Sequence, residues 1–155
     1  MIFIYHQKLD DLWCAAAIKD DKILATSWSS SEQIILKQML EGVPAGESFQ
    51  VAEKPSQLAE KVLRSIRLMI DGKDVALNFK YETAYLPKYT QRVLSFLTQV
   101  PVGYVTTYGA LAKAAGGGAR AVGNVMARNP FAPLVPCHRV VGSDFSLVGY
   151  GGGQI

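Results

Sequence analysis

The chain has 155 residues, of which 49% are hydrophobic and 19% are charged, and its formal net charge is +3 at pH 7. This length and balance indicate one domain of ordinary size or two small ones, and they exclude a disordered chain. The apolar runs are short and interrupted by charges, so no segment is expected to span a membrane. The N-terminus lacks the basic and apolar regions of a secretion signal.

The first residues predict strands of a small sheet. Residues 2–5 are predicted to form a short strand, and the apolar runs at 12–18 and 23–28 are predicted to form a hairpin. Its polar turn is expected at 19–22, Lys-Asp-Asp-Lys. Residues 75–81 are expected to be a further strand or an extended linker.

Two helices are predicted in the same half of the chain. The serines at 30–31 can cap a helix over 32–41, which Gly42 closes. The second helix is expected to start at residues 55–56 and to end at 71–72. Its apolar residues recur at helical spacing, so they are expected to line a core rather than a functional site. This half is therefore predicted to be an α/β unit without chemistry of its own.

The character of the sequence changes at residues 86–87. An amphipathic helix is predicted over 90–97, and an extended segment is predicted over 103–108. We therefore expect two domains, residues 1–83 and residues 84–155.

A helix-turn-helix is predicted in the second domain. Thr107 can cap a helix over 108–115, and three glycines at 116–118 provide a sharp turn. A further helix is expected over 119–128, ending at Asn129-Pro130 because the residue before proline resists the α region. The second helix of such a pair usually enters a groove of DNA, although many helical hairpins bind nothing.

Charge is divided unevenly between the two halves. Residues 1–85 carry 10 Lys and Arg against 12 Asp and Glu, a balance of −2. Residues 86–155 carry 6 Lys and Arg against one acid, Asp144, a balance of +5. The second half is therefore the half suited to a polyanion.

The two cysteines lie in different contexts. Cys137 stands in the run 135–141, Val-Pro-Cys-His-Arg-Val-Val, beside two potential cations that favour a thiolate, which is the nucleophilic form. A buried structural cysteine is the alternative interpretation. Cys14 lies beside Trp13 in an apolar strand, so it is interpreted as a packing residue. An intracellular, reduced protein is expected, with a disulfide between the two cysteines as the alternative.

Five features in order resemble the O6-alkylguanine-DNA alkyltransferase family: Tyr108, Arg-Ala-Val-Gly at 120–123, Asn-Pro at 129–130, Pro-Cys-His-Arg-Val at 136–140 and Gly-Tyr-x-Gly-Gly at 149–153. The resemblance covers about the second half of the chain. It implies an α/β N-terminal domain with a small antiparallel sheet and helices, ribonuclease H-like. A mainly α C-terminal domain of winged-helix or helix-turn-helix type would follow.

The resemblance implies a chemical role for three residues. Cys137 would be the alkyl acceptor, and His138 would be the base that takes its proton through a water molecule. Asn129 would brace the connector beside the active site. In the family a glutamate after the glycine pair orients the histidine, whereas residues 86–155 contain no glutamate. Either the sequence is a truncated form or another carboxylate, with Glu82 as the candidate, takes that place.

The resemblance also implies contacts with DNA. Arg120 would enter the base stack in place of a nucleotide turned out of the duplex, since a stacked base hides the alkyl carbon from any side chain. Tyr108 would press on the adjacent phosphate and offer its hydroxyl to the purine. The small residues Ala121 and Gly123 would allow close approach to the DNA backbone, and Arg128 adds a basic helix end. The guanine pocket would be lined by Met126, Val140, Tyr150 and Gly151.

The function that the resemblance implies is DNA repair by a methylated-DNA–[protein]-cysteine S-methyltransferase. It would transfer an alkyl group irreversibly from O6-alkylguanine in double-stranded DNA to Cys137, with O4-alkylthymine left open as a substrate. Each molecule would react once, because a thioether has no leaving group for hydrolysis. No cofactor is expected, and no metal, because the first half lacks the ligands of the structural zinc that some members carry. A cytoplasmic monomer is expected.

Three other functions remain open from the sequence. The first is a non-catalytic alkylated-DNA-binding protein of the alkyltransferase-like type, against which Cys137 argues. The second is a helix-turn-helix regulator with an α/β sensor domain, which would leave the Pro-Cys-His-Arg run without a purpose. The third is a thiol hydrolase, which would need turnover and an oxyanion site.

Overall fold

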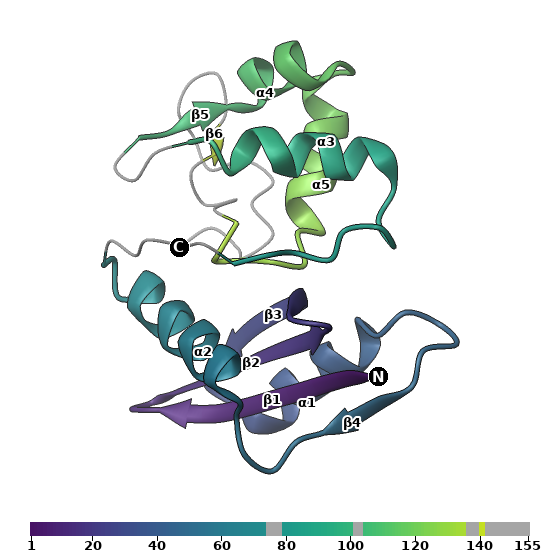
Figure 1. The fold of residues 1–155 in the computed structure, drawn as a ribbon. Coiled ribbons are helices and arrows are strands. Elements are labelled where there is room, and N and C mark those ends of the chain that lie inside the picture. The colour runs from purple at the N-terminus through teal and green to yellow at the C-terminus, as the bar shows by residue number, and fades with distance from the viewer. Residues whose placement is uncertain (74–78, 101–103, 136–139, 142–155) are drawn as a thin grey trace. The chain divides into compact units, whose positions relative to one another are not determined.

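A computed structural model describes residues 1–73, 79–100, 104–135 and 140–141 of the chain (Figure 1). It divides the chain into two compact units, Met1–Tyr85 and Leu86–Ile155. Most of the strand or linker expected at 75–81 lies outside the described residues. In the described part of the chain, every helix falls short of the length and apolar character that a membrane span requires.

The first unit is built on a four-stranded sheet. Strands β1 (Ile2–Leu9), β2 (Leu12–Lys19) and β3 (Lys22–Ser29) pair antiparallel in sequence order. Strand β4 (Phe49–Val51) pairs with β1 in the parallel direction, which gives the order β3-β2-β1-β4. The sheet is therefore mixed, and the expectation of a purely antiparallel sheet is wrong at this edge. A strand of three exposed residues has no hydrophobic alternation that a sequence pattern could reveal.

Aspartates form the tight turn of the predicted hairpin. Asp20 and Asp21 have φ angles of 51° and 62°, and Lys19 pairs with Lys22 across them. Positive φ at both central residues is what a two-residue hairpin turn needs, and Asp tolerates it better than most residues. The turn predicted at 19–22 is confirmed.

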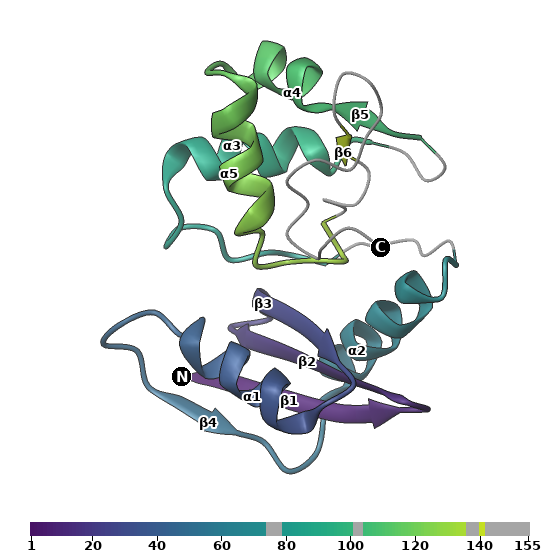
Figure 2. The ribbon, with the colours of Figure 1, turned by 180° about the vertical axis from the view of Figure 1, so that it is seen from behind.

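Two capped helices cover the sheet on opposite faces (Figures 1 and 2). In α1 (Glu32–Glu41) the amide of Ile34 donates to Ser31 Oγ over 3.4 Å. In α2 (Gln57–Ile70) the amide of Ala59 donates to Ser56 Oγ over 3.1 Å. Both predicted helices are confirmed. Helix α1 buries Ile35 and Met39 against a cluster formed by Ile2, Ile4, Ala15, Ala17, Leu24 and Ala25.

The described part of the second unit is mainly helical. Helix α3 (Lys88–Leu97) packs beside α4 (Tyr108–Ala115) and α5 (Ala119–Ala127) (Figures 1 and 2). Strand β5 (Thr106–Thr107), which lies between α3 and α4 in the chain, pairs in parallel with β6 (Val140–Val141), which follows α5. The core of this unit contains Val93, Leu97, Leu111, Val122, Met126 and Phe131.

The three helices predicted in this unit are confirmed. Thr107 caps α4, since the amide of Ala110 donates to Thr107 Oγ1 over 3.0 Å. The turn after α4 has positive φ at Gly116 and Gly117, 90° and 75°, a region that glycine occupies at little cost. Helix α5 ends at Ala127, one residue before the predicted end. Strand β6 was not predicted.

We expect side chains on the buried face of α2 to contribute more to the free energy of unfolding than side chains on its exposed face. Ile66 is fully buried, whereas Leu68 on the same helix is 37% exposed. Ile66→Ala is expected to lower the free energy of unfolding by about 2–5 kcal/mol, because it removes buried methyl groups and leaves a cavity. The matched variant Leu68→Ala is expected to cost less than about 1 kcal/mol. Urea unfolding followed by circular dichroism measures both, and equal losses would contradict this packing.

Candidate functional site

The second helix of the helix-turn-helix presents a basic face without acids. Arg120 is the second residue of α5 and is exposed, as are Asn124 one turn later and Arg128 just after the helix. The expected DNA contacts Ala121 and Gly123 are half-buried. Sequence analysis did not single out Asn124, although its spacing of four residues from Arg120 places both on one face. This face can accept an anionic partner.

The structure brings Tyr108 and Gly123 together. Tyr108 begins α4 and is only 7% exposed. A Cβ atom on Gly123 would lie 3.9 Å from Tyr108 Cε1, in ordinary contact distance. Gly123 therefore lies beside the tyrosine ring with room for a methyl group, and the DNA contacts expected of both residues stay predictions.

Asn129 closes the connector that leads to the cysteine run. Its Nδ2 donates to the carbonyl of Val135 over 2.7 Å, and its Oδ1 accepts from the amide of Phe131 over 2.9 Å. Within the same turn, the amide of Val135 donates to the carbonyl of Phe131 over 3.0 Å. One amide side chain thus holds both ends of the turn, and Phe131, Leu134 and Val135 are buried beneath it.

The run that contains Cys137 follows one fixed point and precedes another. Val135 is held by Asn129 before it, and Val140 pairs with Thr106 after it. Four residues, 136–139, separate these points; Cys137 and His138 are among them and lie outside the described residues. Tyr150 and Gly151 also lie outside, and of Val140 only the strand pairing is described.

Met126, expected in the guanine pocket, is 1% exposed and lies in the core of the second unit. It lies on α5 two residues after Asn124, on the opposite, buried side of the helix. Its contact with a base therefore stays a prediction.

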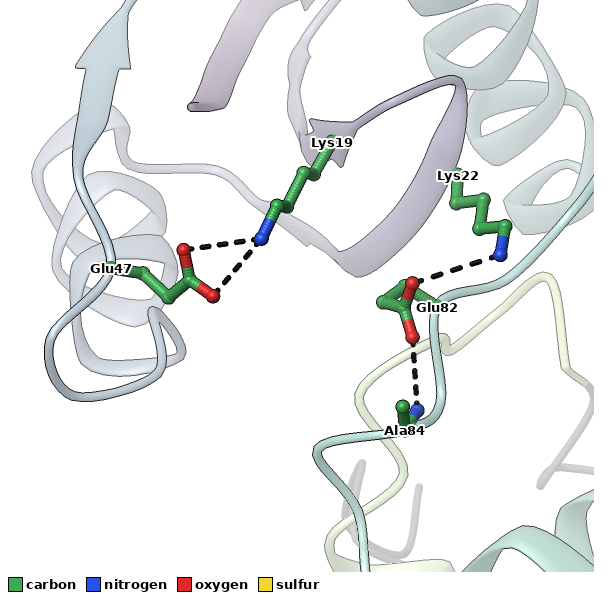
Figure 3. A network of polar contacts seen from close by, with 5 residues as sticks. All are labelled: Lys19, Lys22, Glu47, Glu82 and Ala84. Atoms are coloured by element: carbon green, nitrogen blue, oxygen red, sulfur yellow. Dashed lines mark hydrogen bonds and ion pairs between the residues drawn. The ribbon is translucent and has the colours of Figure 1, made fainter.

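Glu82, the expected substitute carboxylate, has two partners in the first unit (Figure 3). Its Oε2 lies 3.8 Å from Lys22 Nζ, and its Oε1 accepts from the amide of Ala84 over 3.1 Å. Its backbone amide also donates to the carbonyl of Ile23 over 2.8 Å. These contacts hold Glu82 beside β3, and a role next to His138 stays a prediction.

Cys14 is excluded as the reactive thiol. It lies in β2 with no exposed surface, and burial raises its pKa from 9.0 to about 11. The charge of Arg67 lowers the pKa by less than burial raises it. At neutral pH this cysteine is a protonated packing residue, since the thiolate is the reactive form.

Similarity to known proteins gives the class of this site. Residues 88–155 match the family model of the 6-O-methylguanine DNA methyltransferase DNA-binding domain. The helix-turn-helix and the braced connector both lie within the matched residues.

The relatives extend the similarity beyond this domain. A methylated-DNA–protein-cysteine methyltransferase of Methanothermobacter thermautotrophicus is 35% identical over 116 residues, which cover 74% of this chain and 64% of the relative. That of Pyrobaculum aerophilum is 48% identical over 82 residues, 53% of this chain and 55% of the relative. The chain thus spans less than two thirds of either relative.

A solved structure matches almost the whole chain. The O6-methylguanine-DNA methyltransferase of Pyrococcus kodakaraensis superposes with a TM-score of 0.70 at 26% identity, covering 99% of this chain and 92% of that one. The chain is thus similar to methylated-DNA–protein-cysteine methyltransferases, by sequence over much of its length and by fold over nearly all of it.

The buried thiol of Cys14 predicts a loss of stability in alkali. In the unfolded chain this thiol ionises near its ordinary pKa, whereas in the fold it keeps its proton up to about pH 11. The unfolded state therefore binds fewer protons between these values, and stability falls as pH rises. Relative to Cys14→Ala, the chain should lose about 2–3 kcal/mol from pH 8 to pH 11. Urea unfolding of both proteins across this range measures the difference; parallel curves would contradict the burial.

Proposed function

We propose that this chain repairs DNA by transferring an alkyl group from O6-alkylguanine to Cys137, irreversibly and once per molecule. The observation that carries the proposal is the connector, where Asn129 fixes Val135 directly before the Pro-Cys-His-Arg run. The relatives are named for transfer to a cysteine from methylated DNA. The second unit of this chain contains a single cysteine.

The chemistry balances with this chain's own groups. The Cys137 thiolate attacks the alkyl carbon, the sulfur–carbon bond forms, and the bond from that carbon to guanine O6 breaks. His138 takes the thiol proton through a water molecule, and a proton returns to the departing guanine. The product is a thioether, which has no leaving group, so each chain is consumed after one transfer.

The DNA partner follows from charge and from the helix-turn-helix. Residues 86–155 have a balance of +5, and the α5 face with Arg120 and Arg128 offers cations to phosphates. A duplex hides the alkyl carbon inside the stack, so the damaged nucleotide is turned outward and Arg120 fills its place. In this proposal the second unit is a winged-helix variant, and the chain acts as a cytoplasmic monomer on duplex DNA.

The self-alkylation of Cys137 is the first test. Incubation with DNA that contains O6-methylguanine should add one methyl group per chain at saturation, located on Cys137 by peptide mass spectrometry. Cys14→Ala should accept the methyl group as the unchanged chain does, because Cys14 is buried and protonated. Cys137→Ser should bind the DNA without any gain in mass, which is also how an alkyltransferase-like binder would behave. A methyl group on Cys14, or many transfers per chain, would overturn the proposal.

The second test separates nucleotide flipping from thiol chemistry. Arg120→Ala should slow the reaction with duplex DNA by about tenfold or more, because extrusion costs a few kcal/mol that the inserted side chain helps to offset. Free O6-benzylguanine needs no extrusion, so its second-order rate should stay nearly unchanged. Lys113→Ala removes one exposed charge from α4 and is the matched control, with its rate at saturating duplex expected to hold. Equal losses for Arg120→Ala on both substrates would assign Arg120 to the fold or the pocket.

A further inference from the structure

Two side chains of α3 donate hydrogen bonds to carbonyls at the C-terminal end of α4. The Tyr89 hydroxyl donates to the carbonyl of Gly116 over 2.8 Å, and Arg92 Nη1 donates to the carbonyl of Ala115 over 2.9 Å. The last carbonyls of a helix have no partner inside the helix, and its C-terminal end attracts a cation. Helix α3 therefore supplies both the hydrogen bonds and the positive charge that α4 needs where it ends.

The glycine turn is shaped against the same tyrosine. Gly117 has a φ of +75°, and a Cβ atom there would lie 2.9 Å from Tyr89 Oη and 3.3 Å from its Cζ. The backbone angle favours glycine at this position, and a Cβ atom would displace the Tyr89 hydroxyl from its present place. The tyrosine thus contacts the turn at two successive residues, through a hydrogen bond to Gly116 and through close packing on Gly117.

Helix α5 begins without a side-chain cap. The residue before it, Gly118, has no side chain that could cap it, and the amide of Val122 donates to the Gly118 carbonyl over 3.2 Å. Arg120 is the second residue of this helix and is exposed. The position of Arg120 therefore depends on the turn at residues 116–118 as well as on the packing of Val122 in the core.

We propose that Tyr89 and Arg92 are positioning residues for Arg120. By holding the last carbonyls of α4, they fix the start of α5 and so set the efficiency with which Arg120 fills the base stack. This inference rests on the proposed function, in which Arg120 acts on the duplex. Neither α3 residue needs to touch the damaged base or the reacting thiol.

Tyr89→Phe is the cleaner of the two substitutions. It removes one hydroxyl and leaves the ring and the charge of the unit unchanged, whereas any neutral replacement of Arg92 also weakens attraction to phosphates. Loss of one neutral hydrogen bond that positions Arg120 should slow the reaction with duplex DNA about threefold to tenfold. The second-order rate with free O6-benzylguanine should stay within about twofold of the unchanged chain, because that reaction needs no inserted arginine.

Tyr85→Phe is the matched control. The Tyr85 hydroxyl donates to the carbonyl of Leu24 in the first unit, so this variant also removes one bond from a tyrosine to a backbone carbonyl. It should leave the ratio of duplex rate to free-base rate unchanged. A ratio that falls equally in both variants would mean that loss of stability, rather than the position of α5, slows duplex repair.

Coupling to Arg120 distinguishes positioning from a general structural role. In an Arg120→Ala background, Tyr89→Phe should produce no further loss on duplex DNA, because the group that it positions is gone. Losses that multiply would overturn the inference, as would equal losses on duplex and free base.

Hydrogen exchange tests the same inference without any reaction. Amides of residues 116–124 should exchange about threefold to tenfold faster in Tyr89→Phe and at the unchanged rate in Tyr85→Phe. Unchanged exchange in Tyr89→Phe would overturn the inference whether or not the chain repairs DNA. Absence of alkyl transfer by the unsubstituted chain would overturn the proposed function alone, since exchange still shows whether Tyr89 holds the start of α5.

Discussion

The candidate site depends on the two hydrogen bonds that the Asn129 side chain makes. The side chain donates to the carbonyl of Val135 and accepts from the amide of Phe131, so the connector needs a group that carries a donor and an acceptor on a short stem. Aspartate carries no donor when ionised, and serine is too short to span both ends of the turn. The buried side chains below the connector keep its backbone in place. The cysteine run therefore begins at a point set by hydrogen bonds as well as by packing.

The distribution of charge differs between the two units. In the first unit Lys19 pairs with Glu47 over 3.0 Å, and Arg67 pairs with Asp11 and Asp71 over 2.9 Å each. Exposed pairs of this kind contribute little stability, but they neutralise the cations locally. The second unit has one acid of its own in its sequence. One carboxylate cannot neutralise six Lys and Arg, so the unit keeps a net positive charge whose field can attract a polyanion.

Local chemistry explains which parts of the fold the sequence predicted. The caps at Ser31, Ser56 and Thr107 were predictable because a cap and its helix lie within three residues of each other. Strands β4 and β6 were not, because they have three and two residues and gain their partners from distant segments. A short strand has no hydrophobic period to detect. Parallel strands are not joined by a tight turn, so the sequence holds no turn signal that would indicate the pair. The same limit applies to the residues expected to contact DNA or to line the guanine pocket, since these roles depend on a ligand and on segments outside the described residues.

The contacts of α3 with α4 show the same limit at the level of side chains. Tyr89 and Arg92 are three residues apart on one helix face, a pattern typical of any solvated surface. Only the tertiary structure brings Arg92 to Ala115, 23 residues further along the chain, and Tyr89 to Gly116, 27 residues further along. The glycine run at 116–118 was recognised as a turn, but glycine permits many turns. The partner on α3 is what selects one of them, and with it the position of Arg120.

The two cysteines illustrate how environment assigns opposite roles to one residue type. Burial keeps Cys14 protonated at neutral pH, and its side chain has no exposed surface. A thiol in this state neither competes for an alkyl group nor attacks an alkylated partner, because both reactions need an accessible thiolate. Cys137 instead stands in sequence beside His138 and Arg139, and a cation or a basic imidazole near a thiol favours the thiolate. In the proposed reaction, a single transfer per chain would then follow from the burial of the second thiol as well as from the stability of the thioether.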